Sequence, residues 1–245
     1  MAGRELAALW DAGALPVGHT VPPCRPARPA RPALHPARSM AKRRAFGSAA
    51  GRIALLHALA HIELNAIDLA WDIVARFSGA DLPAAFFDDW VGVAAEEGLH
   101  FGLLSARLGE IGAAYGDLPA HDGLWEAAEA TAGDLLARLA VVPLVLEARG
   151  LDVTPDMIVR LERAGDLPSA RLLDRIYRDE IGHVAVGARW FERLCRERGL
   201  PPDVAFRDRV RRFFKGRLKP PFNHAARDAA GLPPLYYEPL GAEAR

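Results

Sequence analysis

Four stretches of this sequence carry apolar residues at helical spacing, and a glutamate occupies one position of each apolar stripe. The clearest stretch runs from Phe86 to Ile111, with apolar residues at steps of three and four on either side of its glutamate. The four glutamates are Glu63, Glu97, Glu147 and Glu180. Burying an ionised carboxylate without a partner costs several kcal/mol, so four such residues on four helices call for a common explanation. A shared cation is the simplest one.

Two of these glutamates belong to Glu-x-x-His motifs, Glu97-x-x-His100 and Glu180-x-x-His183. Residues three apart share one face of a helix, so the carboxylate and the imidazole can bind one ion together. With a single glutamate from each of the other two helices, the motifs form the ligand set of di-iron and di-manganese carboxylate bundles. The alternative is a core of buried ion pairs and satisfied polar contacts. The six predicted ligands are Glu63, Glu97, His100, Glu147, Glu180 and His183.

Turns containing glycine and proline separate the four stretches, and they lie at residues 78–83, 116–119 and 165–168. In an antiparallel helical hairpin, residues at equal depth lie equally far from the turn. The midpoint of the first two glutamates falls at residue 80, inside the first turn. The midpoint of the last two falls next to the third turn, so both pairs are predicted to meet at matching depth.

These features predict an all-α fold: a ferritin-like antiparallel four-helix bundle with an extra C-terminal helix, an extended Pro-rich N-terminal arm and an irregular C-terminal tail. The predicted parts are an N-terminal extension at 1–47, the bundle with a short basic helix at 48–218, and a tail at 219–245 that packs on the bundle. Seven prolines from Pro16 to Pro36 exclude helix and central strand in the arm. The arm lies along the domain or a partner subunit, or is disordered; the sequence leaves these alternatives open.

The third stretch is expected to be distorted. Pro143 lies four residues before Glu147 and cannot donate a backbone hydrogen bond, which predicts a local distortion around that glutamate. The helix should continue toward residue 164, with a kink or short break near Gly150. Thr154-Pro155-Asp156 has the pattern of a helix cap followed by proline at the first helical position.

Four further residues are candidates to contact the ligands instead of the ions. Glu96 and Asp179 precede the two motif glutamates and could accept the free N–H of a ligating histidine, or they point toward neighbouring helices or water. Tyr177 could hydrogen-bond a ligand, or it is an ordinary core tyrosine. His61 lies about 200° around the helix from Glu63, so the two should not bind the same ion directly. We expect His61 to lie behind the ligands or in the core.

The composition is that of a soluble globular protein, with 31 basic and 31 acidic residues and therefore no overall attraction to nucleic acid. Cys24 and Cys195 are expected to be unpaired thiols in a reducing cytoplasm. A basic segment after residue 202 is either a solvated face paired with acidic neighbours, which we favour, or a surface for RNA phosphates. Its principal residues are Arg207, Arg211, Arg212 and Lys215. A homodimer is left open.

Segments 57–63, 96–100, 146–151 and 177–183, together with Lys219-Pro-Pro-Phe-Asn223, resemble a bacterial ferritin-like family of unknown function over nearly the whole chain. The resemblance implies a di-metal four-helix bundle and brings no established substrate. A more distant similarity, in the Glu-Ala-Arg context that begins at Glu147, is to the di-iron tRNA hydroxylases.

The expected function is therefore that of a non-haem di-iron carboxylate protein. It would bind two iron ions, with manganese or a mixed pair as alternatives, and act as an oxidase or oxygenase on a small substrate, with dioxygen as co-substrate. Two alternatives stay open: a ferroxidase or iron-handling protein, and an RNA-modifying hydroxylase. The sequence leaves the substrate unidentified.

Overall fold

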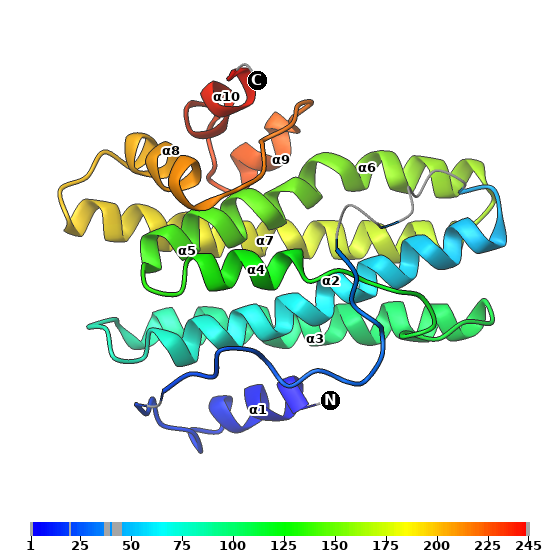
Figure 1. The fold of residues 1–245 in the computed structure, drawn as a ribbon, viewed down its shortest axis with the longest axis horizontal. Coiled ribbons are helices and arrows are strands. Elements are labelled where there is room, and N and C mark those ends of the chain that lie inside the picture. The colour runs from blue at the N-terminus through cyan, green and yellow to red at the C-terminus, as the bar shows by residue number, and fades with distance from the viewer. Residues whose placement is uncertain (1, 20, 37–39, 41–45, 244–245) are drawn as a thin grey trace. The chain divides into compact units, whose positions relative to one another are not determined.

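A computed structural model describes residues 2–19, 21–36, 40 and 46–243, and these residues form helices and loops without a β-strand (Figure 1). The predicted all-α class is confirmed at this level. The chain divides into two compact units, one made of Met1–Trp125 and Arg160–Leu172, the other of Glu126–Val159 and Leu173–Arg245. The three-part division predicted from the sequence stays a prediction.

The first unit is built on a hairpin of two long helices, α2 (Ala49–Arg76) and α3 (Ala84–Glu110), which lie side by side (Figure 1). Ser48 caps α2, because its hydroxyl accepts a 3.0 Å hydrogen bond from the Gly51 amide. The loop between the helices is centred on residue 80, as the turn at 78–83 predicts. Apolar side chains from both helices are almost fully buried, among them Leu56, Leu69, Ile73, Phe86, Trp90 and Leu104.

The chain starts with a helix that the sequence analysis did not predict. Helix α1 (Ala2–Asp11) packs against α3, and the indole N–H of Trp10 donates a 2.9 Å hydrogen bond to Asp88. The segment is so short that its pattern of polar and apolar residues did not indicate a helix or the surface that this helix covers. Ten residues of helix become stable only when a neighbour buries one face.

The described part of the Pro-rich arm is extended and lies along the first unit. Arg28 donates a 2.7 Å hydrogen bond to the Asn65 side chain and lies 3.3 Å from Asp68 on α2. The Trp125 indole donates to the backbone oxygen of Cys24 at 3.2 Å. Of the alternatives that the sequence left open, the structure shows the arm against its own chain.

Among the described residues, one helix, α2, is long and apolar enough to cross a membrane, by length and composition alone. More than half of its most apolar window is buried inside the protein, as in the core helix of a packed domain. The predicted cytoplasmic location stays a prediction.

The chain between α3 and α7 is divided differently from the prediction. It contains α4 (Gly123–Ala130), α5 (Leu135–Val141), a π-helical segment (Val142–Glu147) and α6 (Ala148–Arg163). The break falls after α4, where the buried Arg138 side chain donates hydrogen bonds to the Thr131 hydroxyl and the Ala128 carbonyl at 2.9 and 2.7 Å. The predicted distortion before Glu147 is confirmed as the π-helical segment. Pro143 lies in its first turn and lacks the N–H that an α-helix needs.

The predicted short break near Gly150 and Pro155 is wrong, because α6 runs through both residues, while the predicted kink there stays a prediction. Proline leaves the carbonyl four residues earlier, that of Leu151, without its helical donor. The side-chain amide of Asn223 donates a 3.1 Å hydrogen bond to this carbonyl. A partner from far along the chain therefore replaces the missing hydrogen bond, and the helix continues.

The C-terminal part follows the long helix α7 (Leu167–Glu197) and contains α8 (Pro202–Phe213), α9 (His224–Ala229) and α10 (Pro234–Ala242). The extra helix after residue 202 is confirmed, but the prediction of an irregular tail is wrong. The tail packs within the second unit. Arg227 forms a 2.7 Å ion pair with Asp152 of α6, and the Tyr236 ring packs against those of Phe191 and Phe206.

Asp166 begins α7 and holds it to α3 within the first unit. Its carboxylate accepts hydrogen bonds from the amide and hydroxyl of Ser169, at 3.2 and 2.9 Å, and from Arg107 at 2.8 Å. Burial raises the pKa of this carboxyl, but the bonds from Ser169 and the charge of Arg107 outweigh it and hold the pKa below its usual range.

Replacing Asp166 should therefore destabilise the protein through two separable effects. Asp166→Ala loses the cap and the ion pair and should lower the free energy of unfolding by about 2–4 kcal/mol at pH 7. Asp166→Asn keeps an oxygen for the cap and should lose less. Because the folded-state pKa is depressed, the charge contributes fully above the unfolded pKa of about 3.9 and is lost as the pH falls through the folded value. Denaturant unfolding at pH 7 and pH 3.5 tests this; equal pH dependence in wild type and Asp166→Asn would contradict it.

Asn223 should stabilise the second unit as Asp166 stabilises the first. Asn223→Ala removes the donor to the Leu151 carbonyl, a 2.9 Å bond to the Tyr177 hydroxyl and the 3.2 Å cap of α9. We expect a loss of about 2–4 kcal/mol in the free energy of unfolding, since about three hydrogen bonds of roughly 1 kcal/mol each are lost. Hydrogen exchange should rise in the amides of α6 near Pro155. Unchanged exchange there would show that Asn223 does not support the helix.

Candidate metal centre

The α2–α3 hairpin brings three of the six predicted ligands together. Glu63 comes from α2, and Glu97 and His100 come from one face of α3. His100 Nδ1 lies 3.3 Å from Glu63 Oε2 and 3.5 Å from Glu97 Oε2. The three side chains can each offer one ligand atom within 4.8 Å of the others. The predicted matching depth of Glu63 and Glu97 is confirmed.

The polarity of this triad contrasts with its surroundings. Glu63 is 5% exposed, Glu97 1% and His100 not at all. Trp90 and Leu104, each about two turns from Glu97 on the same helix, are equally buried. Two carboxylates in such a place need strong compensation, because burial penalises each charge by several kcal/mol.

Both separations are longer than those of a tight ion pair, and the shorter one is that expected for two ligands of one ion. Charge-assisted hydrogen bonds from nitrogen to a carboxylate measure about 2.7–2.9 Å, and both contacts of His100 are longer. Two donors that each lie about 2.1 Å from one metal at tetrahedral or octahedral angles are about 3.0–3.4 Å apart. The carboxylate and imidazole groups also match the ligand preferences of iron, manganese and zinc. The residues present therefore fit a divalent metal.

The protonation of His100 follows from the same neighbours. Burial alone lowers the pKa of the imidazole, but the two neighbouring carboxylates, Glu63 and Glu97, raise it to about 11. Without a metal, His100 thus supplies the positive charge that the two carboxylates require. A divalent cation can take the place of this proton, since a ligating histidine is neutral.

The second unit carries the other three predicted ligands. Glu180 and His183 lie on one face of α7, with His183 Nδ1 3.6 Å from Glu180 Oε1. His183 is buried, and the Glu180 side chain is 14% exposed. Glu147 is the last residue of the π-helical segment and is half-buried. The motif on α7 thus repeats the approach of carboxylate to imidazole found on α3.

His61 binds the loop that follows α3. Because a backbone carbonyl can only accept, its Nε2–H donates to the His121 oxygen at 3.0 Å, and Nδ1 then accepts from the Tyr115 hydroxyl at 2.8 Å. Burial lowers the pKa of His61 to about 4, so the ring is neutral. These two bonds occupy both ring nitrogens. Sequence reasoning missed Tyr115, because a loop residue has no periodicity that could place it.

The other candidates around the ligands have different surroundings. Glu96 is exposed. Asp179 lies 3.9 Å from Arg175 on the same helix. The Tyr177 hydroxyl accepts a hydrogen bond from Asn223 of the tail, a contact that no local pattern indicates.

The basic helix α8 forms several contacts within its own unit. Arg207 donates to the Leu235 carbonyl at 2.6 Å and pairs with Asp203 at 2.7 Å. Arg211 pairs with Glu243 at 2.5 Å. Ion pairs with acidic neighbours are what we expect of a solvated face. Arg212 and Lys215 are exposed.

Comparison with known proteins identifies the family of the chain. Residues 1–238 match the model of a family described as "Protein of unknown function (DUF455)". An uncharacterized protein from Haemophilus influenzae (strain ATCC 51907 / DSM 11121 / KW20 / Rd) is 43% identical over 197 residues, which cover 78% of this chain and 68% of the relative. No solved structure matches. The chain therefore belongs to the DUF455 family.

Proposed function

We propose that this protein is a non-haem di-iron, or manganese/iron, carboxylate protein whose two ligand triads together bind two ions within a ferritin-like four-helix bundle. The observation that carries the proposal is the triad of Glu63, Glu97 and His100, buried on apolar helix faces with ligand atoms within 4.8 Å of one another. In this proposal Glu180 and His183, which repeat the motif on α7, would form the second triad with Glu147, the last residue of the π-helical segment.

The donor set favours a redox metal. Four carboxylates and two imidazoles hold iron or manganese, whereas a site built from oxygen donors alone suits magnesium or calcium. When bound, such ions supply oxidation by dioxygen, which protein side chains alone do not provide. The expected reaction is oxidation or hydroxylation of a small substrate.

The chain's own residues have three tasks in this proposal. Glu63, Glu97 and His100 would hold and orient an ion, and His100 would bind it through a neutral imidazole. Burial largely excludes water from the Glu97 carboxylate, which strengthens electrostatic interactions there. Glu147 ends the π-helical segment, a kind of distortion that is frequent at functional sites.

Metal analysis tests the proposal. The full chain, reconstituted with ferrous iron without oxygen and then desalted, should hold about two ions per chain. Glu97→Gln and Glu180→Gln should each reduce the content to one ion or fewer, because each removes a charged ligand from a different triad. Dioxygen should then produce an optical change in the wild type that both variants lack.

Two surface carboxylates serve as matched controls on the same helices. Glu96→Gln on α3 and Asp174→Asn on α7 replace exposed side chains and should keep the full metal content. Circular dichroism verifies that all four variants are folded. Retention of two ions by both ligand variants would refute the proposal, whereas loss in Glu97→Gln alone would reduce it to a single-ion site in the first unit. Uptake of many ions per chain would favour the iron-handling alternative.

A further inference from the structure

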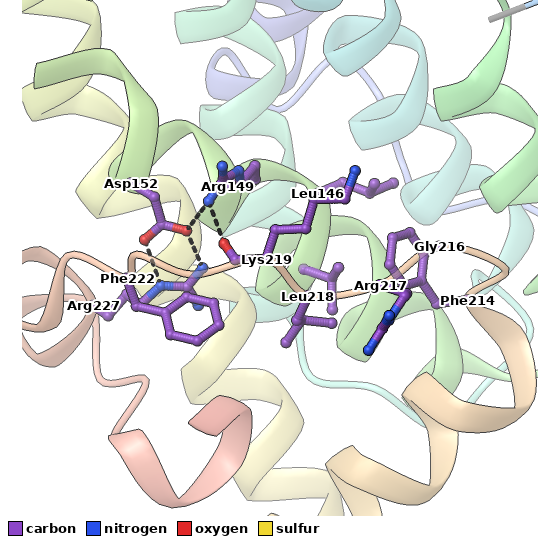
Figure 2. Close-up of a pocket in the computed structure, with 11 residues that line it drawn as sticks. Leu146, Arg149, Asp152, Phe214, Gly216, Arg217, Leu218, Lys219, Phe222 and Arg227 are labelled. Carbon is purple, nitrogen blue, oxygen red and sulfur yellow. Dashed lines mark hydrogen bonds and ion pairs between the residues drawn. The ribbon is translucent and has the colours of Figure 1, made fainter. Parts of the chain in front are cut away.

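The second unit contains a cavity of about 270 Å³ beside the segment that ends in Glu147. One wall is formed by the end of the π-helical segment and the start of α6, from Val145 to Asp152, and the opposite wall by the loop from Phe214 to Phe222 (Figure 2). Arg227 of α9 also lines it. The volume is just below the roughly 300–1,000 Å³ of small-molecule sites, so a ligand must be small.

The charged residues of this cavity are strongly unbalanced. Four cations, Arg149, Arg217, Lys219 and Arg227, face one carboxylate, Asp152. That carboxylate is fully buried and already accepts bonds from Arg227 at 2.7 and 2.8 Å and from Arg149 at 3.3 Å (Figure 2). Its charge is neutralised within the wall. The cavity therefore keeps a net positive charge.

Two of the cations still have donors to offer. Arg227 is 2% exposed, and its Nη1 has no hydrogen-bond acceptor among the described residues, although Nε and Nη2 bind Asp152. A buried guanidinium N–H without an acceptor costs free energy, which a bound anion would recover. Lys219 is exposed, so its ammonium group can reach an anion at the mouth. Arg149 uses Nη1 for its protein hydrogen bonds.

The remaining lining is apolar and in part aromatic. Leu146 and Leu218 lie on opposite walls, and Phe214 and Phe222 stand at the two ends of the loop (Figure 2). Gly216 allows the Phe214 ring to lie against the loop, because a Cβ at this position would come within 2.4 Å of that ring. A ligand that fits must combine an anionic head with an apolar body.

We propose that this cavity binds a small organic anion, with a phosphate or carboxylate head held by Arg227 and Lys219 and an apolar body held against Phe214 and the two leucines. The binding itself does not depend on a metal. Leu146 of the wall directly precedes Glu147, a proposed metal ligand. On the basis of the proposed function, the anion would be its substrate, and the substrate class is then a small amphipathic acid.

Calorimetric titration of the full chain with phenyl phosphate, benzoate, inorganic phosphate and phenol tests the proposal. At least one of the two aromatic anions should bind more tightly than both inorganic phosphate and phenol, and their relative affinities distinguish a phosphate head from a carboxylate head. Lys219→Gln should weaken that binding about twofold to fivefold, the effect of removing one exposed cation. The matched control is Lys215→Gln, an exposed lysine in the same segment that does not line the cavity, and it should bind as the wild type does.

Other outcomes would overturn the proposal. Equal weakening by Lys215→Gln and Lys219→Gln, or tighter binding of a twelve-nucleotide single-stranded RNA with equal sensitivity to both changes, would indicate a general basic surface. Equal binding of phenol and phenyl phosphate would exclude recognition of the anion. The Glu180→Gln variant should keep its affinity for the aromatic anion whatever its metal content, so failure of the metal centre and failure of this cavity are separate results. Loss of affinity in that variant would contradict a metal-independent site.

Discussion

The first unit depends on the burial of two carboxylates against one imidazole. Glu63 and Glu97 approach His100 from two helices, and a hairpin that failed to align these residues would leave charges in an apolar core. The register of α2 against α3 is thus determined by polar groups as well as by packing. Buried polar groups of this kind favour one alignment of the helices at a cost in stability, because apolar residues of similar size often stabilise a core as well or better.

Much of the fold follows from the pattern of the sequence. Periodicity, Ser48 as a cap and the turn around residue 80 predict the α2–α3 hairpin, since all three are local signals. The triad on this hairpin follows from the same geometry. Residues that act through distant partners could not be predicted. Pro155 has the local pattern of a helix start, and what overrides it is Asn223, which belongs to another part of the chain.

The tail shows the same limit. The prolines and aromatic residues of segment 219–245 predict irregular structure. Helices α9 and α10 form there nevertheless, because Arg227, Tyr236 and Tyr237 are buried within the second unit. Short helices of six to nine residues depend on such tertiary contacts. Their sequences carry little helical signal of their own. The candidate cavity likewise combines residues of α6 and of the tail, and no linear motif joins them.

The hydrogen bond from Asn223 to Leu151 spans 72 residues of sequence. A ribosome makes the chain from its N-terminus, so the carbonyl left by Pro155 is synthesised well before its donor. Helix α6 is therefore synthesised before the donor that completes its hydrogen bonds, which lies in the last tenth of the sequence. A chain shortened before Asn223 would keep the local helical pattern of α6 but lack the donor that replaces the hydrogen bond missing at Pro155.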